Sequence, residues 1–174
     1  MQEFQITILP FGDDVPLRDL RLLNEKLIEI LDFIEPKIEI QDQIEIPTQS
    51  YNSSRNQFLG KPFLKIAHSL KGTKVLGITN VDLYTPELNF IFGQAEINGK
   101  TCVISLNRLK PGVKRSIYES RMVKEAVHEL GHTLGLRHCD DRLCVMHFSN
   151  CLDDTDIKGE EYCENCRTLL MKRR

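Results

Sequence analysis

Two histidines and a glutamate in the second half of the chain have the spacing of a metal-dependent reactive site. His128 and His132 are four residues apart, so on a helix both imidazoles project from one face, one turn above the other. Two neutral imidazoles on one face can bind a zinc ion, and Glu129 beside them can act as general base on a zinc-bound water. The spacing therefore predicts a catalytic zinc site in which Glu129 activates the water.

A third histidine extends the pattern. Gly135 lies one turn beyond His132, where helices often end with a residue of positive φ. Such a bend would turn His138 back toward the pair as a third ligand and leave the fourth zinc position for water. A bare HExxH also occurs on helices whose histidines bind nothing. The added glycine and histidine at fixed spacing favour a zincin of the metzincin type.

The cysteines indicate a second metal site. Five of the six follow residue 138, and in a reducing compartment clustered cysteines act as metal ligands sooner than as disulfides. Residues 149–161 are too polar to be held by a hydrophobic core, so a metal cross-link would stabilise them. We predict a structural, tetrahedral four-thiolate zinc site formed by Cys139, Cys144, Cys163 and Cys166.

Two alternatives for these cysteines stay open at this point. Cys151 could complete the zinc site in place of Cys139 or Cys144. The pair Cys163 and Cys166 could instead be a redox CxxC, although the glutamates around it would disfavour formation of its thiolate.

The composition is that of an ordinary globular protein. A chain of 174 residues with 41% hydrophobic and 28% charged residues suits one compact domain. A net charge of −2 gives no reason to expect nucleic acid or a membrane surface as a partner. The N-terminus lacks the pattern of a signal peptide, and no apolar run approaches a membrane span. We therefore expect a cytoplasmic protein, and a monomer.

The first elements predict the start of a parallel sheet. Residues 4–9 read as a strand that ends at Pro10, residues 16–34 as an amphipathic helix and residues 37–41 as a half-buried strand. A strand, helix and strand in this order favour a right-handed crossover and parallel pairing of the two strands.

The middle of the chain predicts a loop, a short helix and a central strand. Residues 47–57 form the one long polar stretch, interpreted as a surface loop in preference to a substrate-contacting segment. Residues 58–70 predict a short helix interrupted by Pro62, and residues 74–79 a strand that is apolar on both faces. Residues 80–86 are rich in turn formers.

Residues 90–97 and 101–106 predict a β-hairpin. They are joined by Asn98-Gly99-Lys100, and an Asn-Gly pair between strand-like runs is a strong hairpin signal. One of the two strands should be antiparallel to the rest and could lie at the sheet edge, where an extended peptide can add as a further strand. Cys102 is interpreted as a small core residue.

A basic loop precedes the helix of the zinc motif. We interpret it as a solvated turn in preference to a nucleic-acid site. Its basic residues are Arg108, Lys110, Lys114 and Arg115. Ser116 is predicted to cap the following helix, with Glu119 as its capping-box partner.

Met146 lies eight residues past the third histidine, a spacing that fits a tight turn beneath the zinc ligands. A methionine by itself is more often core filler. His147 is predicted to be a polar residue of that turn. Tyr84, Tyr118 and His147 are candidates for stabilising the oxyanion of the reaction, and the sequence does not rank them.

The combined motif resembles that of the archaemetzincins, metzincin metallopeptidases of archaea and some eukaryotes. Their pattern is HExxHxxGxxHC, four residues, Cys, one residue, Met and a later CxxC, and it is met here from His128 to Cys166. The gap before the CxxC is one residue shorter than is usual in the family, within a loop. The resemblance covers most of the chain from about residue 75 onward, with weaker similarity at the N-terminal strand and helix.

The resemblance implies an α+β, metzincin-like fold. It consists of a twisted mixed sheet with an antiparallel edge strand over the cleft, an active-site helix and a Met-turn. By the same resemblance three histidines bind the catalytic zinc, Glu129 is the general base, and four cysteines hold a structural zinc. We expect residues 1–174 to form a single catalytic domain, in which 139–174 are the Met-turn and the zinc-stapled C-terminal part.

We therefore predict a zinc-dependent metallopeptidase with two zinc ions per chain, acting on a peptide or protein substrate. The alternative is a non-enzymatic or latent zinc-binding interaction protein that retains the metzincin site. Glu129 favours the enzyme, because a purely structural metal has no use for an adjacent base.

Overall fold

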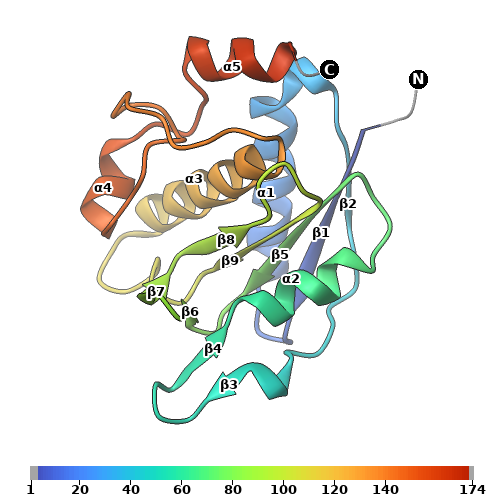
Figure 1. The fold of residues 1–174 in the computed structure, drawn as a ribbon, viewed down its shortest axis with the longest axis vertical. Helices are drawn as coiled ribbons and strands as arrows, with labels where there is room; N and C mark the ends of the chain where they lie inside the picture. Colours follow the sequence, from blue (N-terminus) through green and yellow to red (C-terminus); the bar gives the residue numbers. More distant parts are fainter. Residues whose placement is uncertain (1–3, 173–174) are drawn as a thin grey trace.

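A mixed five-stranded sheet forms the centre of the computed structural model, which describes residues 4–172. Its strands are β1 (Gln5–Phe11), β2 (Lys37–Ile40), β5 (Lys74–Thr79), β8 (Gly93–Ala95) and β9 (Thr101–Ser105). The helices are α1 (Leu17–Ile30), α2 (Lys61–His68), α3 (Arg115–Thr133), α4 (Leu152–Ile157) and α5 (Glu164–Met171). Helices α1 and α3 cover one face of the sheet and α2 the other (Figure 1). The predicted mixed sheet is confirmed.

The strand order is β2-β1-β5-β9-β8, with every neighbouring pair parallel except β8 and β9. The predicted parallel pairing of the first two strands is confirmed. Side chains alternate across β1, so Ile6 and Ile8 enter the core under α1 and α3 while Leu9 and Phe11 enter the smaller core under α2. The strand runs two residues past its predicted end, because Phe11 still pairs with Thr79 of β5.

The predicted first helix is shorter than expected. It ends at Ile30, and a separate 3₁₀ turn (Asp32–Ile34) follows before Glu35 reverses the chain with a φ of 47°. Its apolar face, which includes Leu20, Leu23 and Leu27, is buried as expected of an amphipathic helix, whereas Leu17 at its start is exposed.

A second, smaller sheet was not predicted. It has the order β3-β4-β6-β7. Its strands are β3 (Tyr51–Asn52), β4 (Gln57–Leu59), β6 (Leu83–Thr85) and β7 (Leu88–Ile91). The interpretation of residues 47–57 as a plain loop, and of 80–86 as a connection only, was therefore incomplete. The strands pair through their backbones, and Arg55 adds side-chain hydrogen bonds to the carbonyls of Leu88 and Asn89 on β7, at 3.0 Å each.

Pro62 is the second residue of α2 and does not interrupt a helix, so that prediction was wrong. Proline lies in the first turn of α2, where its missing N–H has no intrahelical partner to lose. Phe63, Leu64 and Ala67 then bury the helix against β5 and β9.

The predicted hairpin is present, with β8 at the edge of the main sheet. Asn98 takes a positive φ of 54° in the turn, as its place before Gly99 suggested. The predicted first strand is divided, because residues up to Ile91 belong to β7 of the smaller sheet and only Gly93–Ala95 pair with β9. Cys102 is fully buried, as predicted, and burial raises its pKa well above the usual value.

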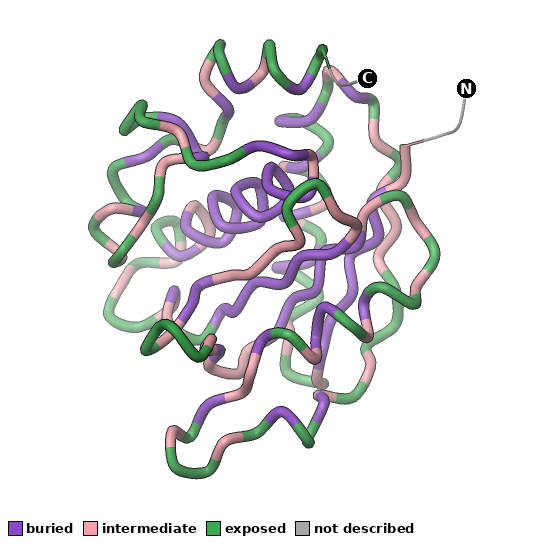
Figure 2. Tube along the Cα trace, viewed as in Figure 1, coloured by how far each residue is buried: buried purple, intermediate pink, exposed green. Residues whose placement is uncertain are grey.

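Helix α3 runs through the interior and is buried along nearly its whole length from Tyr118 onward (Figure 2). The predicted capping box is wrong. The helix begins at Arg115, so Ser116 lies inside it, and Lys114 at the N-cap makes no side-chain bond. Glu119 instead accepts a hydrogen bond from Arg115 at 2.6 Å.

The basic loop is more than a solvated turn, because both of its arginines are in ion pairs. Arg108 donates two hydrogen bonds to Asp82, each at 2.7 Å, and Arg115 pairs with the buried Asp19. In the part of the chain that the structure describes, no helix combines the length and the apolar character needed to cross a membrane.

Candidate functional site

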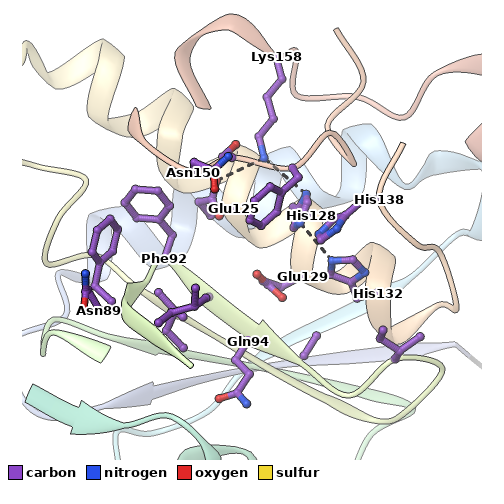
Figure 3. Close-up of a pocket in the computed structure, with 18 residues that line it drawn as sticks. Asn89, Phe92, Gln94, Glu125, His128, Glu129, His132, His138, Asn150 and Lys158 are labelled. Atoms are coloured by element: carbon purple, nitrogen blue, oxygen red, sulfur yellow. Dashed lines mark hydrogen bonds and ion pairs between the residues drawn. The ribbon is translucent and has the colours of Figure 1, made fainter. Parts of the chain in front are cut away.

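Helix α3 and the turn that follows it bring the three predicted histidines together. His128 and His132 lie one turn apart on α3, which ends at Thr133. Gly135 then takes a φ of 91°, as predicted, and turns the chain so that His138 faces the pair (Figure 3). One ring nitrogen from each histidine lies within 4.8 Å of the others. The spacing of three side chains from a helix and a turn thus produces one compact donor set.

The hydrogen bonds of the two helical histidines fit a cation between them. His128 Nδ1 lies 2.8 Å from the carbonyl oxygen of Val145, and His132 Nδ1 lies 2.9 Å from that of Leu136. A carbonyl only accepts, so each Nδ1 carries the hydrogen and each Nε2 presents a lone pair. The two Nε2 atoms face one another at 3.1 Å. Two lone pairs at this distance repel unless a cation lies between them, and tetrahedral zinc holds imidazole nitrogens about 3.3 Å apart.

Burial favours the neutral form of these imidazoles, which is the form that binds metal. It lowers the pKa of His128 well below the usual value and also lowers the pKa of His132 and His138. The ammonium of Lys158 acts in the same direction on all three, since a nearby positive charge disfavours a second one.

Glu129 lies beside the histidines, between α3 and the edge strand β8. Only 6% of the residue is exposed, and it lines the cleft that contains the three imidazoles. Burial raises the pKa of its carboxyl group well above the usual range. The neighbouring Glu125 raises the pKa of Glu129 further, while Lys158 lowers it. The predicted base therefore faces the same space as the predicted ligands.

The four predicted cysteines form a second cluster, with all four sulfur atoms within 4.8 Å of one another. Two Sγ–Sγ distances are 3.8 Å, between Cys139 and Cys163 and between Cys144 and Cys166. A tetrahedron with Zn–S bonds of about 2.3 Å has edges of about 3.8 Å, so the cluster fits zinc and is far from disulfide geometry.

Cys151, the alternative member, does not join the cluster. It is exposed, and its Sγ contacts Asp154 at 3.5 Å. The alternative of a redox CxxC is also disfavoured, because Cys163 and Cys166 lie against the other two thiols in the geometry of a four-sulfur metal site.

The segment after the third histidine connects the two metal sites. His138 and Cys139 are adjacent in sequence but belong to different clusters. The Cys139 amide donates to the carbonyl of Met146 at 3.0 Å, which closes the turn predicted beneath the histidines. Met146 is fully buried against α3 at Gly131, where an added methyl group would collide with the methionine sulfur. Met146 is thus both a turn residue and a core residue.

A cleft of about 430 Å³ opens over the histidines. One wall is the segment from β7 to β8, including Phe90 and Phe92, and the opposite wall is the segment of Phe148, Ser149 and Asn150. Tyr84 and Tyr118, two of the predicted oxyanion candidates, lie elsewhere: Tyr84 OH accepts from Asn52, and Tyr118 OH donates to Asp19. His147, the third candidate, uses Nδ1 on the carbonyl of Cys139.

Sequence reasoning missed two charged residues of this cleft, Glu125 and Lys158. Glu125 precedes Glu129 by one helical turn, so its spacing alone places both carboxylates on one face of α3. Lys158 lies 30 residues beyond His128 in a polar stretch, and no local pattern connects it to the site.

Comparisons with known proteins identify the family. The model of peptidase family M54 matches residues 42–172. The archaemetzincin of Methanocaldococcus jannaschii is 41% identical over 174 residues, covering 97% of this chain and 94% of that protein. The archaemetzincin of Methanopyrus kandleri is 44% identical over 172 residues, covering 97% and 96%.

Solved structures give the same result. The crystal structure of the Methanopyrus kandleri archaemetzincin has a TM-score of 0.90 at 36% identity and covers 98% of this chain and 95% of that one. The archaemetzincin of Archaeoglobus fulgidus, complexed with malonate, has a TM-score of 0.84 at 35% identity and covers 95% and 99%. The chain therefore belongs to peptidase family M54, the archaemetzincins, and is a zinc metallopeptidase.

Proposed function

We propose that His128, His132 and His138 hold the catalytic zinc and that Glu129 is the general base of peptide-bond hydrolysis. The observation that carries the assignment is the pair of facing Nε2 lone pairs, fixed by carbonyl bonds behind each ring, with a buried carboxylate beside them. When bound, zinc supplies a Lewis acid that lowers the pKa of water and polarises the substrate carbonyl.

Glu129 performs the proton transfers of the proposed reaction. Its carboxylate takes a proton from the attacking water as the new C–O bond forms, and passes it to the amine nitrogen as the C–N bond breaks. Its place between the histidines and β8 puts it beside a peptide laid along the edge strand. The free edge of β8 offers that peptide backbone hydrogen bonds, since only its other edge pairs with β9.

We propose that Cys139, Cys144, Cys163 and Cys166 hold a structural zinc. The 3.8 Å sulfur separations support this assignment, as does the polar character of the segment that the cluster ties to α3. Residues 1–174 then act as one catalytic domain, with 139–174 as its zinc-stapled part. A four-cysteine zinc site suits a reducing, cytoplasmic location, and we propose a monomer.

Metal analysis and one substitution test the catalytic assignment. Purified protein should contain two zinc ions per chain, and freshly zinc-loaded protein should cleave members of an unbiased peptide library. Glu129→Ala should abolish cleavage and leave both zinc ions in place. Cleavage that survives in this variant would show that another group is the base, and loss of one zinc would show that Glu129 supports metal binding.

A further inference from the structure

A buried ion pair lies at one end of the cleft, next to the histidines. The Lys158 side chain has an exposure of 0% and that of Glu125 an exposure of 4%, and their charged atoms are 3.4 Å apart. Figure 3 shows Lys158 reaching toward α3 and ending between Glu125 and His128. Burying two charges costs free energy that apolar residues of the same volume would not cost. If this wall of the cleft served only to fill space, apolar residues would do so at a lower cost in free energy than the ion pair.

The pair is also loosely held. Lys158 Nζ lies 3.4 Å from the carbonyl oxygen of His147 and 3.5 Å from His128 Nδ1, whose hydrogen is already donated to Val145. On Glu125, the contacts with Lys158 and with the Thr155 hydroxyl, both at 3.4 Å, fall on the same oxygen, Oε1. All of these distances exceed those of strong charge-assisted hydrogen bonds, which are about 2.7–2.9 Å. The carboxylate thus keeps capacity to accept a closer donor.

Glu125 is placed where a substrate side chain would lie. It is one helical turn before Glu129, at the end of the cleft bounded by Phe92 and Asn150. A peptide antiparallel to β8, the more stable pairing, runs from the Ala95 end of that strand toward Phe92. The side chain that reaches Glu125 then belongs to the part of the peptide on the C-terminal side of the cleaved bond.

We propose that Glu125 and Lys158 form the floor of a substrate pocket that selects a neutral carboxamide side chain, glutamine first. This inference rests on the proposed function. The glutamine N–H donates to the Glu125 carboxylate, and the length of the side chain suits an acceptor that is only 4% exposed. Its carbonyl oxygen can accept from the side-chain N–H of Asn150, which lines the same end of the cleft, while the fully buried Lys158 holds Glu125 in place from behind.

Charge excludes the other side-chain classes. The pair Glu125 and Lys158 is neutral as a unit, so an added charge has no unpaired partner there. A cationic side chain would also be repelled by the positive charge of the nearby zinc, and an anionic side chain would be repelled by the carboxylate of Glu129. An apolar side chain would exclude water from the carboxylate without replacing its hydrogen bonds, and a buried group left unsatisfied in this way weakens binding.

Short hydroxamates test the pocket without requiring turnover. The hydroxamate binds the zinc and fixes the register, so that the residue X of hydroxamate–X–Ala-amide occupies the pocket. Four compounds with X as Gln, Leu, Lys or Glu are compared by calorimetry with zinc-loaded protein. We expect the Gln compound to bind at least about tenfold more tightly than each of the others. Equal affinities, or a preference for Leu, Lys or Glu, would overturn the proposal.

Variants assign the preference to the ion pair. The double variant Glu125→Met, Lys158→Met removes both charges and the accepting oxygens at similar volume, and it should bind the Leu compound more tightly than the Gln compound. If the double variant does not fold, Glu125→Met alone should remove the Gln preference. Glu119→Met, on the same helix but outside the cleft, is the matched control and should retain the preference. Gln preference that persists in folded Glu125→Met protein would contradict the role of Glu125.

Failure of the proposed function has a different signature. Acetohydroxamate, which lacks any side chain, should bind zinc-loaded protein measurably and should not bind after the histidine site is emptied. If zinc is bound at the histidines and acetohydroxamate binds, but no side-chain preference is found, the pocket proposal is wrong and the catalytic assignment stands. A protein without zinc at the histidines disproves the catalytic assignment.

Discussion

The backbone of Gly93 lies directly against the side chain of Glu129. A methyl group on Gly93 would stand 2.6 Å from both Cγ and Oε1 of the glutamate, closer than any real non-bonded contact. The edge strand and the proposed base can share this space only because the strand has no side chain at that point. Strand β8 therefore fixes one side of the position of Glu129, while α3 fixes the other.

Gly93→Ala should damage catalysis more than folding. The new methyl group must push Glu129 or β8 away by close to 1 Å, and a displacement of that size can cost on the order of 100-fold in rate. We expect peptide cleavage to fall by about that factor with two zinc ions still bound. Gly112→Ala is the control, because nothing lies within 4 Å of its added methyl group. Its φ of 72° costs stability only, about 1 kcal/mol. Wild-type cleavage by Gly93→Ala would refute the steric argument.

Gly131→Ala should destabilise the turn beneath the histidines. Its methyl group would collide with the sulfur of Met146 and lie 3.0 Å from the Tyr162 ring. Overpacking of this kind costs about 1–3 kcal/mol, so the midpoint of thermal unfolding should fall by several degrees. In a Met146→Ala background, where the methyl group has room, the same Gly131→Ala substitution should cost less than it costs in the wild type. If the single variant melts like the wild type, the turn is more deformable than its packing indicates.

The sequence predicted those parts of the fold that depend on local patterns. The spacing of His128, His132 and Gly135 is a property of one helix and its end, so it could be interpreted without neighbours. The Asn98-Gly99 turn and the apolar strand Lys74–Thr79 are similar cases. In each of these cases the structure depends on residues that are close together in the sequence, so the local pattern is enough to predict it.

The missed features depend on partners far away in the chain. Arg55 donates to carbonyls of the smaller sheet that lie 33 and 34 residues later in the chain, and no local sequence pattern around Arg55 predicts these partners. Lys158 reaches α3 from a polar stretch, yet its own side chain is fully buried in an ion pair with Glu125. Ser116 was a reasonable cap by type, but the helix begins two residues earlier than that cap would give, at Arg115, whose guanidinium pairs with Asp19 and Glu119.

Removal of the four-sulfur metal should unfold the C-terminal part of the chain. Cys163→Ser takes one ligand from the proposed structural zinc, whose binding contributes several kcal/mol or more to folding. We expect one zinc fewer per chain and faster proteolysis within residues 139–172. Cys151→Ser is the matched control, because this exposed cysteine lies in the same segment but outside the cluster. Equal zinc content and proteolysis in the two variants would argue against a structural metal.

The ion pair between Arg121 and Asp156 should make stability depend on pH. Arg121 donates two hydrogen bonds to this carboxylate, at 2.7 and 2.6 Å, and attaches α4 to α3. The bonds from Arg121 hold the pKa of Asp156 below its usual value. A carboxyl group with a lowered folded-state pKa stabilises the protein above its unfolded pKa of about 3.9 and loses that contribution as pH falls through the lower folded value.

Asp156→Asn should therefore be less stable than the wild type at pH 7, and the difference should shrink below about pH 4. The Asp156 side chain is 38% exposed, so solvent screening limits the difference to about 1 kcal/mol or less. Urea unfolding of both proteins at pH 7 and at pH 3 measures it. Acid also removes zinc, but it does so in both proteins, so their difference still reports the ion pair. A difference that is as large at pH 3 as at pH 7 would assign the loss to packing and not to the charge of Asp156.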